Sequence, residues 1–259
     1  MEKYNRTVMK TLDILETLKI NGVAMSCKEV AEKLNIPLSS AFDIMKTLLA
    51  EDYIEYADER AKLYRIGPKC FEVGSSYIRQ QDVLSVARPF AIRLMKISNA
   101  TSFIVTVYHD HIIYLDKIEA PTSIRTSAVL GSRMEMYCTG LGKSILACYC
   151  KEEVERIFDK TNIVKLSDHT ITDINVLLKD LEATRKRGYA IDDREGNNDV
   201  YCIAAPIIGS EGKPIAAISV AMMYSMRTDA LVEDLGTTIS SYALTISRKM
   251  GYTGNTLYL

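Results

Sequence analysis

Apolar residues recur at helical spacing near the start of the chain and predict a first helix from about Arg6 to Ile20. This helix is expected to end at Asn21 and Gly22, because both residue types tolerate left-handed backbone. Its buried face is predicted to consist of Val8, Leu12, Leu15 and Leu18.

Two further helices and a hairpin follow. Ser26 and Glu29 have the spacing of a capping box and open a short helix that stops before Pro37. A longer helix is expected from about Leu38 to Glu51, and strand-like runs at 53–57 and 63–66 flank the polar turn 58–61. The buried stripe of the longer helix is predicted from Ala41, Ile44, Met45 and Leu48. This order is typical of a winged helix-turn-helix, whose second helix enters the major groove of DNA.

The rest of the chain alternates between helix-like and strand-like runs. Residues 69–84 read as a linker helix, because the segment is not rich in Gly, Pro or Ser. Further helices are expected at 83–98, 141–150, 152–160, 173–187 and 228–250, and strands at 102–108, 112–117, 188–193, 200–208 and 214–221. Strands joined by hairpins, with helices on one side, predict an α+β domain with an antiparallel sheet.

Composition adds little support for DNA binding. The 259-residue chain has a formal net charge of −1, and residues 1–70 hold eleven Lys and Arg against eleven Asp and Glu. DNA-binding domains are usually basic, so any DNA binding must depend on local charge placement and on oligomerisation. With six cysteines, no signal peptide and no long apolar span, a cytoplasmic protein with reduced thiols and no membrane partner is expected.

The candidate DNA contacts divide into two kinds. Arg60, Lys62 and Lys10 are expected at phosphates, where they position the protein without reading sequence. Side chains on the outer face of the second helix would meet base edges, and Asp43 among them would repel phosphate or accept a hydrogen bond from cytosine. The full expected set is Lys10, Lys28, Ser39, Ser40, Phe42, Asp43, Lys46, Arg60 and Lys62.

Two short motifs suggest chemistry that their surroundings do not support. Residues 140–144 end in Gly-Lys-Ser, but a phosphate loop needs glycine where Tyr137 stands. Backbone amides at this helix start could still hold a small anion. His109 and His111 flank Asp110 at an expected hairpin tip without a third ligand, so a solvated turn is favoured and no metal or cofactor is expected.

Acidic residues 192–195 precede a polar loop and the apolar strand that begins near Cys202, and three readings stay open here. Paired acids beside a thiol could belong to a cysteine enzyme, with Cys138 or Cys202 as the nucleophile, but no histidine lies nearby in sequence to activate the thiol. A charged loop that caps a core strand is the plainest reading. A pocket for a small polar ligand is the third.

Three ordered blocks resemble the IclR family of bacterial transcriptional regulators, and the resemblance covers nearly the whole chain. The blocks are residues 7–15, residues 131–147, and residues 188–195 together with 202–206. The family implies a winged helix-turn-helix at 1–68, a linker helix at 69–84, and a GAF-like effector-binding and oligomerisation domain at 85–259. It also implies operator DNA, a small effector such as an organic acid, and a homodimer or dimer of dimers as partners.

The resemblance places the effector at particular residues. Gly140 and Leu141 would present backbone amides, and Val200 would form an apolar wall. Asp192, Cys202 and Ser219 would line the far side. Ala221 stands where the family often has a second small hydroxyl, which implies a less polar effector or one hydrogen bond fewer.

The start of the second helix departs from the family. Leu38 and Asp43 occupy positions where basic residues are common, so the chain lacks two cationic contacts and weak, salt-sensitive binding is predicted. We therefore expect a ligand-responsive DNA-binding regulator without catalysis, which controls a catabolic operon. The alternative is a GAF-like metabolite sensor that acts through a protein partner and has weak or lost DNA binding.

Overall fold

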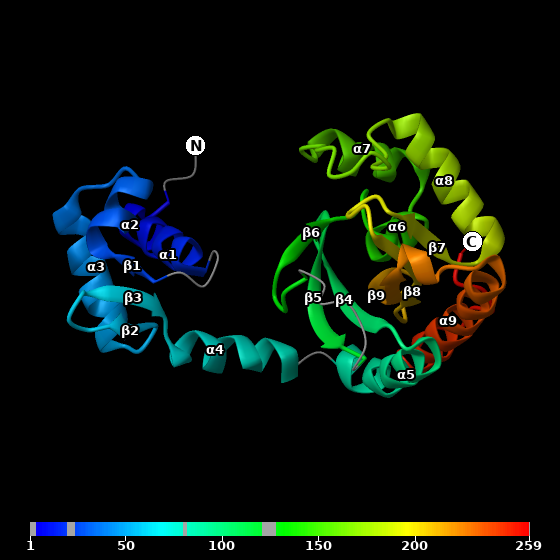
Figure 1. Ribbon diagram of the computed structural model, residues 1–259, viewed down its shortest axis with the longest axis horizontal. Coiled ribbons are helices and arrows are strands. Elements are labelled where there is room, and N and C mark those ends of the chain that lie inside the picture. The colour runs from blue at the N-terminus through cyan, green and yellow to red at the C-terminus, as the bar shows by residue number, and fades with distance from the viewer. Residues whose placement is uncertain (1–3, 20–23, 80–81, 121–127, 259) are drawn as a thin grey trace. The chain divides into compact units, whose positions relative to one another are not determined.

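The computed structural model describes residues 4–19, 24–79, 82–120 and 128–258. The chain divides into two compact units, residues 1–80 and 81–259, each with its own hydrophobic core (Figure 1). None of the described helices is long and apolar enough to cross a membrane.

The first unit is a winged helix-turn-helix. Its elements are α1 (Arg6–Lys19), β1 (Met25–Ser26), α2 (Cys27–Lys33), α3 (Leu38–Ala50), β2 (Ile54–Asp58), β3 (Leu63–Ile66) and α4 (Pro68–Arg79). The strands form an antiparallel sheet in the order β1-β3-β2, in which β2 and β3 make the wing. The predicted stripe of α3 is confirmed, because all four of its residues are buried.

The predicted capping box also forms. The Ser26 side chain accepts a hydrogen bond from the Glu29 backbone N–H, and the Ser26 backbone N–H donates to Glu29 Oε2 at 2.7 Å. These bonds satisfy two donors that a helix N-terminus otherwise leaves free.

The prediction for the buried face of α1 is wrong in part. Val8 and Leu12 are 53% and 51% exposed, whereas Ile14, Thr17 and Leu18 face the core. At about 100° per residue, Leu12 points nearly opposite to that buried group. The apolar residues of α1 thus form two faces, and periodicity does not say which one meets the core. The predicted helix end at 20–22 lies outside the described residues.

The second unit is built on one six-stranded antiparallel sheet in the order β6-β5-β4-β9-β8-β7. Its strands are β4 (Thr101–Tyr108), β5 (His111–Ile118), β6 (Arg133–Glu135), β7 (Ala190–Asp193), β8 (Val200–Ile208) and β9 (Pro214–Met223). Its helices are α5 (Asp82–Ser98), α6 (Gly140–Leu146), α7 (Lys151–Lys160), α8 (Ile174–Arg187), the short 3-10 helix η2 (Tyr224–Met226) and α9 (Asp229–Lys249). The linker predicted at 69–84 overlaps the helix predicted at 83–98, and residues 82–84 lie in α5.

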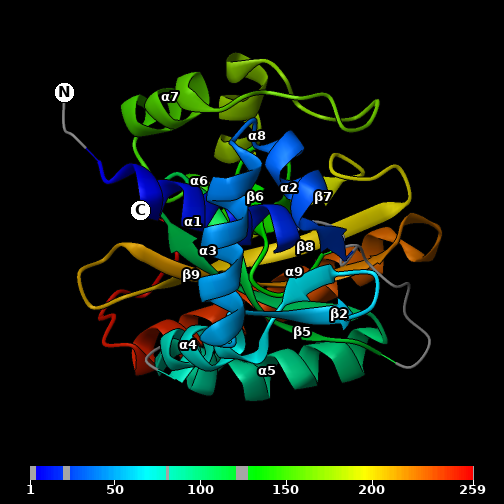
Figure 2. The same ribbon diagram turned by 90° about the vertical axis from the view of Figure 1, so that its left-hand side faces the viewer.

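Helices cover both faces of this sheet, not one face as predicted. Figure 1 shows α5 beside α9 at the lower right of the second unit, and Figure 2 shows the same elements after a 90° turn. The rings of Phe90 from α5 and Tyr242 from α9 lie 5.2 Å apart. On the other face α6 packs against β8, and α8 lies outside α6. Every residue of β8 after Val200 is buried, as expected of a strand covered on both sides.

Helix α6 is shorter than the predicted 141–150. Its N-cap Thr139 accepts a hydrogen bond from the Gly142 N–H, and the helix ends at Leu146. Arg185 from α8 donates to the carbonyls of Ala147 and Tyr149 at 2.8 and 3.0 Å. A side chain from a distant helix thus satisfies the carbonyls after the last turn, which local sequence cannot reveal.

Candidate functional site: a ligand cavity and a DNA-facing helix

A cavity of about 480 Å³ lies between α6 and the sheet of the second unit. Its size falls in the range of small-molecule sites. All six residues expected at the effector line it, namely Gly140, Leu141, Asp192, Val200, Cys202 and Ser219. Residues that are far apart in sequence thus lie around one cavity. This is the arrangement expected if residues 192–195 belong to a pocket for a small polar ligand.

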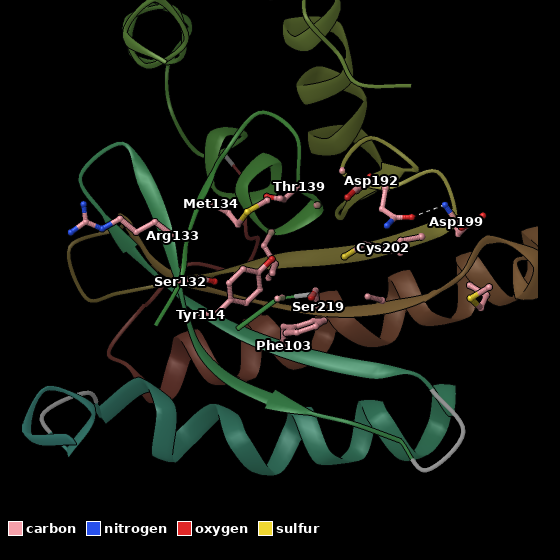
Figure 3. A pocket seen from close by; sticks show the side chains of 18 residues that line it. Phe103, Tyr114, Ser132, Arg133, Met134, Thr139, Asp192, Asp199, Cys202 and Ser219 are labelled. Atoms are coloured by element: carbon pink, nitrogen blue, oxygen red, sulfur yellow. Dashed lines mark hydrogen bonds between the residues drawn. The ribbon is translucent and has the colours of Figure 1, made fainter. Parts of the chain in front are cut away.

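The strand register explains why these residues share one wall. Asp192 on β7 pairs with Cys202 on β8, which pairs with Ala221 on β9. Ser219, two residues before Ala221, pairs with Phe103 on β4. Because side chains alternate between the faces of a strand, these residues point to the same side of the sheet, toward α6 (Figure 3).

The cavity also includes residues that sequence reasoning missed. Phe103 and Tyr114 stack edge to face, with ring centroids 5.3 Å apart, and form an aromatic floor. Arg133 belongs to the lining, but its side chain turns away from the cavity in Figure 3 and its guanidinium lies 5.2 Å from the Tyr108 ring. Phe103 could have been found only by knowing that β4 pairs with β9.

Asp192 is the buried acid of the cavity wall. Burial raises the pKa of this carboxyl to about 6, although nearby Lys143 and backbone N–H donors act in the opposite direction. One of these donors is the N–H of Glu195, 2.7 Å from Asp192 Oδ1. A modest change in surroundings can therefore change the charge of Asp192 near neutral pH.

Lys143 lies behind the cavity wall in a buried ion network. Its side chain is 1% exposed, and its Nζ donates to Asp180 Oδ2 at 2.8 Å and to Glu195. Burial lowers the pKa of Lys143, but the two carboxylates outweigh this and raise it overall. Burial raises the pKa of Glu195 to about 7. Lys143 is thus fully engaged within the protein, which agrees with rejecting the phosphate-loop reading.

One buried hydroxyl in the wall, that of Ser219, lies beside the weakly hydrogen-bonding thiol of Cys202. Ser219 is fully buried, and its Oγ is among the few buried polar side-chain atoms of the described residues without a hydrogen bond to oxygen or nitrogen. Such groups are rare because an unsatisfied buried hydroxyl is unfavourable. Its position in the cavity wall makes it available to a ligand.

The cysteines near the cavity are poorly suited to nucleophilic chemistry. Burial raises the pKa of Cys138 and of Cys202 to about 12, so both remain thiols at neutral pH.

His109 lies at the β4–β5 turn with a φ of 52°, and His111 contacts Glu135 at 3.3 Å. Among the described residues, no three His, Cys, Asp or Glu side chains group as metal ligands would.

On the first unit, α3 presents most of the expected base-contacting residues to solvent. Ser39, Phe42, Asp43 and Lys46 are exposed, and Phe42 shows 55% of its surface. Ser40 is half-buried and accepts a hydrogen bond from Lys10 Nζ at 3.2 Å. This bond ties α1 to the start of α3, so Lys10 and Ser40 would approach DNA as a pair.

The remaining expected cations lie on the wing and on α2. Lys62 has a left-handed φ of 52°, and its ammonium lies 4.8 Å from the Tyr56 ring. Arg60 is exposed in the wing turn, where its backbone N–H donates to Asp58 Oδ1. Lys28 forms an exposed ion pair with Glu32 at 3.8 Å. Of these three, Arg60 and Lys62 form no ion pair among the described residues, and Arg60 also lacks an aromatic contact there.

Comparison with known proteins gives consistent matches. The model of the IclR helix-turn-helix domain matches residues 7–58, and that of the C-terminal domain of bacterial IclR transcriptional regulators matches residues 75–248. The HTH-type transcriptional repressor AllR of Escherichia coli K12 is 32% identical over 250 residues, which cover 96% of this chain and 92% of AllR.

Solved structures agree with these matches. The crystal structure of Thermotoga maritima IclR is 30% identical with a TM-score of 0.79, over 95% of this chain and 99% of that one. An IclR homologue from Microbacterium hydrocarbonoxydans, crystallised with 4-hydroxybenzoate, has a TM-score of 0.79 at 20% identity, over 94% of this chain and 99% of that one. The second likeness concerns the fold alone.

Proposed function

The chain belongs to the IclR family of bacterial transcriptional regulators, and we propose that it represses a catabolic operon under the control of a small effector. The observation that carries the proposal is the cavity, where all six expected effector residues meet in a chain that also contains a winged helix-turn-helix. Repression is supported by the name of its relative AllR, an HTH-type transcriptional repressor.

The effector in this proposal is an organic acid or a related small metabolite. The mixed lining supports this class, since aromatic and aliphatic side chains lie beside Asp192, Ser219 and Thr139. A distant homologue was crystallised with an aromatic acid, 4-hydroxybenzoate. Ala221 in the wall favours an effector with a less polar body. No cofactor or metal takes part.

DNA binding in this proposal uses residues 1–68, with α3 in the major groove and the wing beside the backbone. Residues 69–84 connect this part to residues 85–259, which bind the effector and join the protomers. A homodimer or a dimer of dimers would place two α3 helices on the two halves of a palindromic operator. The effector would act by favouring one arrangement of protomers, and the protein would work in the cytoplasm.

Fluorescence anisotropy of the full chain on the DNA upstream of its own gene tests this function. We expect saturable binding at low salt that weakens as salt rises, and a metabolite found by thermal-shift screening should move the curve. Arg60→Ala should weaken binding, whereas Lys213→Ala, at an exposed lysine of the second unit, should leave it unchanged. Absence of binding to any upstream DNA at low salt would refute the proposal.

The alternative of a sensor that acts only through a protein partner is not favoured. The relatives that this chain matches are transcriptional regulators and repressors with a helix-turn-helix, and α3 of this chain has an exposed outer face. If that alternative held, Asp43→Arg would change no measurable property of the chain on DNA.

A further inference from the structure

Among the residues that the structure describes, the effector cavity has acidic groups in its wall and no cation that faces into it. Asp192 is buried in the wall, and Asp199 lies exposed at the rim. Arg133 is the cationic residue of the lining, and its side chain is directed away, over Tyr108. A carboxylate that entered this cavity would lie near Asp192 without a positive charge from the described lining residues beside it.

The nearest buried cation is already paired. Lys143 lies two residues after the lining residue Leu141, yet its ammonium is held by Glu195 and by Asp180. These two carboxylates belong to the β7–β8 turn and to α8. To reach a ligand, Lys143 would have to leave Glu195 as a buried, unpaired charge, which is strongly unfavourable.

The other groups around Asp192 do not supply positive charge. Tyr114 from β5, Cys202 from β8 and Cys138 before α6 are neutral, because burial raises the pKa of each far above the neutral range. Asp193 next to it on β7 is paired with Arg194 at 2.8 Å. The buried ionisable groups at this place are therefore the Lys143 ammonium and the carboxyls of Asp192 and Glu195. The half-buried Asp180 carboxylate also contacts Lys143.

We propose that the cavity takes an organic acid as its carboxylate together with one proton from solvent, which the Asp192 carboxyl group then carries. This inference rests on the proposed function. Protonation removes the repulsion between the two carboxylates and turns Asp192 into a hydrogen-bond donor. The Ser219 hydroxyl, which lies beside the Cys202 thiol, supplies a second donor in the same wall.

The proton gives the binding a particular pH dependence. Asp192 in the free protein has a pKa of about 6. Below that pH the carboxyl already holds its proton, and the affinity for a carboxylate is constant. Above it, each binding event takes up a proton, so the dissociation constant rises about tenfold per pH unit. An uncharged ligand of the same shape shows no such dependence.

Isothermal titration calorimetry of the full chain with 4-hydroxybenzoate and with acetate, as the minimal carboxylate, tests the inference. The uncharged matches are 4-hydroxybenzamide and acetamide. Between about pH 6 and about pH 8 we expect carboxylate binding to weaken about fiftyfold, with about one proton taken up near pH 7.5, as measured in buffers of different ionisation enthalpy. Asp192→Asn should remove the pH dependence, and Asp199→Asn, at the exposed rim, should keep it.

Three results would overturn the inference: carboxylate binding that does not change with pH, the same slope in Asp192→Asn, or no carboxylate binding even near pH 5.5. The proposed function is judged separately on DNA. If an uncharged metabolite binds and releases the operator, the function stands and the inference fails. If carboxylates bind with a proton but the chain never binds DNA, the inference stands and the function fails.

Discussion

Replacing Lys143 with methionine tests whether the buried ion network holds the second unit together. Methionine keeps much of the length and apolar character of the lysine side chain, so the change mainly removes the ammonium. Glu195 then loses its cation while it remains buried, and among the described residues Asp180 keeps an ion pair with Arg187, whose guanidinium is 3.7 Å away.

Removing one partner of a buried ion pair typically reduces the free energy of unfolding by about 3–5 kcal/mol. The loss should depend on pH, because burial already raises the pKa of Asp192 to about 6 and that of Glu195 to about 7. Both pKa values in the folded protein lie above those in the unfolded chain. The stability that the two carboxyls contribute is therefore present at low pH and is lost as the pH rises through 6 to 7. Without Lys143 both pKa values rise further. The variant should therefore be closest to wild type near pH 5.5, and above the wild-type pKa values it should fall behind by about 1.4 kcal/mol per pH unit for each carboxyl that stays protonated in the folded variant but is ionised in folded wild type.

Urea unfolding followed by far-ultraviolet circular dichroism measures this loss, since the chain contains no tryptophan. The matched control is Lys186→Met on α8, where the lysine is 75% exposed and pairs with Glu182 at 2.7 Å. An exposed pair contributes about 1 kcal/mol or less, so the control should differ little from wild type at any pH. Equal losses for the two variants, or a Lys143→Met loss that does not grow between about pH 6 and about pH 8, would refute the reasoning.

Three more predictions follow from the two sites. Asp43→Arg exchanges an exposed repulsive charge on α3 for a cation, so DNA affinity should rise and the slope of log K against log salt should steepen by about one in anisotropy titrations; an unchanged slope would place Asp43 away from the phosphates. Ser219→Ala removes a hydroxyl that has no oxygen or nitrogen partner among the described residues, so thermal stability should be kept or slightly raised while effector affinity falls about fivefold in calorimetry; unchanged affinity would show that the hydroxyl does not touch the effector. Iodoacetamide near neutral pH should label the exposed Cys150 well before Cys138 and Cys202, whose pKa values burial raises to about 12, and fast labelling of either buried thiol by mass spectrometry would contradict this.

Local signals in the sequence predict much of the first unit. The Ser26 and Glu29 spacing predicted a capping box that forms, and the buried stripe of α3 followed from its helical period. The misplaced face of α1 marks the limit of this reasoning. Val8 and Leu12 fit a helical period as well as Ile14 and Leu18 do, and only tertiary packing decides between the two faces.

The second unit was less accessible, because its cavity depends on which strands pair. The resemblance to a family located Asp192, Cys202 and Ser219, but Phe103 enters the wall only through the pairing of β4 with β9. Strand order is a long-range property that periodicity within each strand does not contain. The Gly-Lys-Ser run of residues 142–144 suggests phosphate binding, and no local pattern indicates that Lys143 is buried between α8 and the β7–β8 turn.

The alternation along β8 and β9 has a consequence for how the protein can evolve. Cys202, Ser219 and Ala221 face the cavity, whereas their neighbours Ile203 and Val220 pair with each other on the opposite face, the side of α9. Substitutions at every second position can therefore alter ligand preference while the packing that maintains the fold stays intact. An insertion of a single residue in either strand has no such freedom, because it would exchange the two faces. New specificities should thus arise in this sheet by replacement, and changes of length should be confined to its loops.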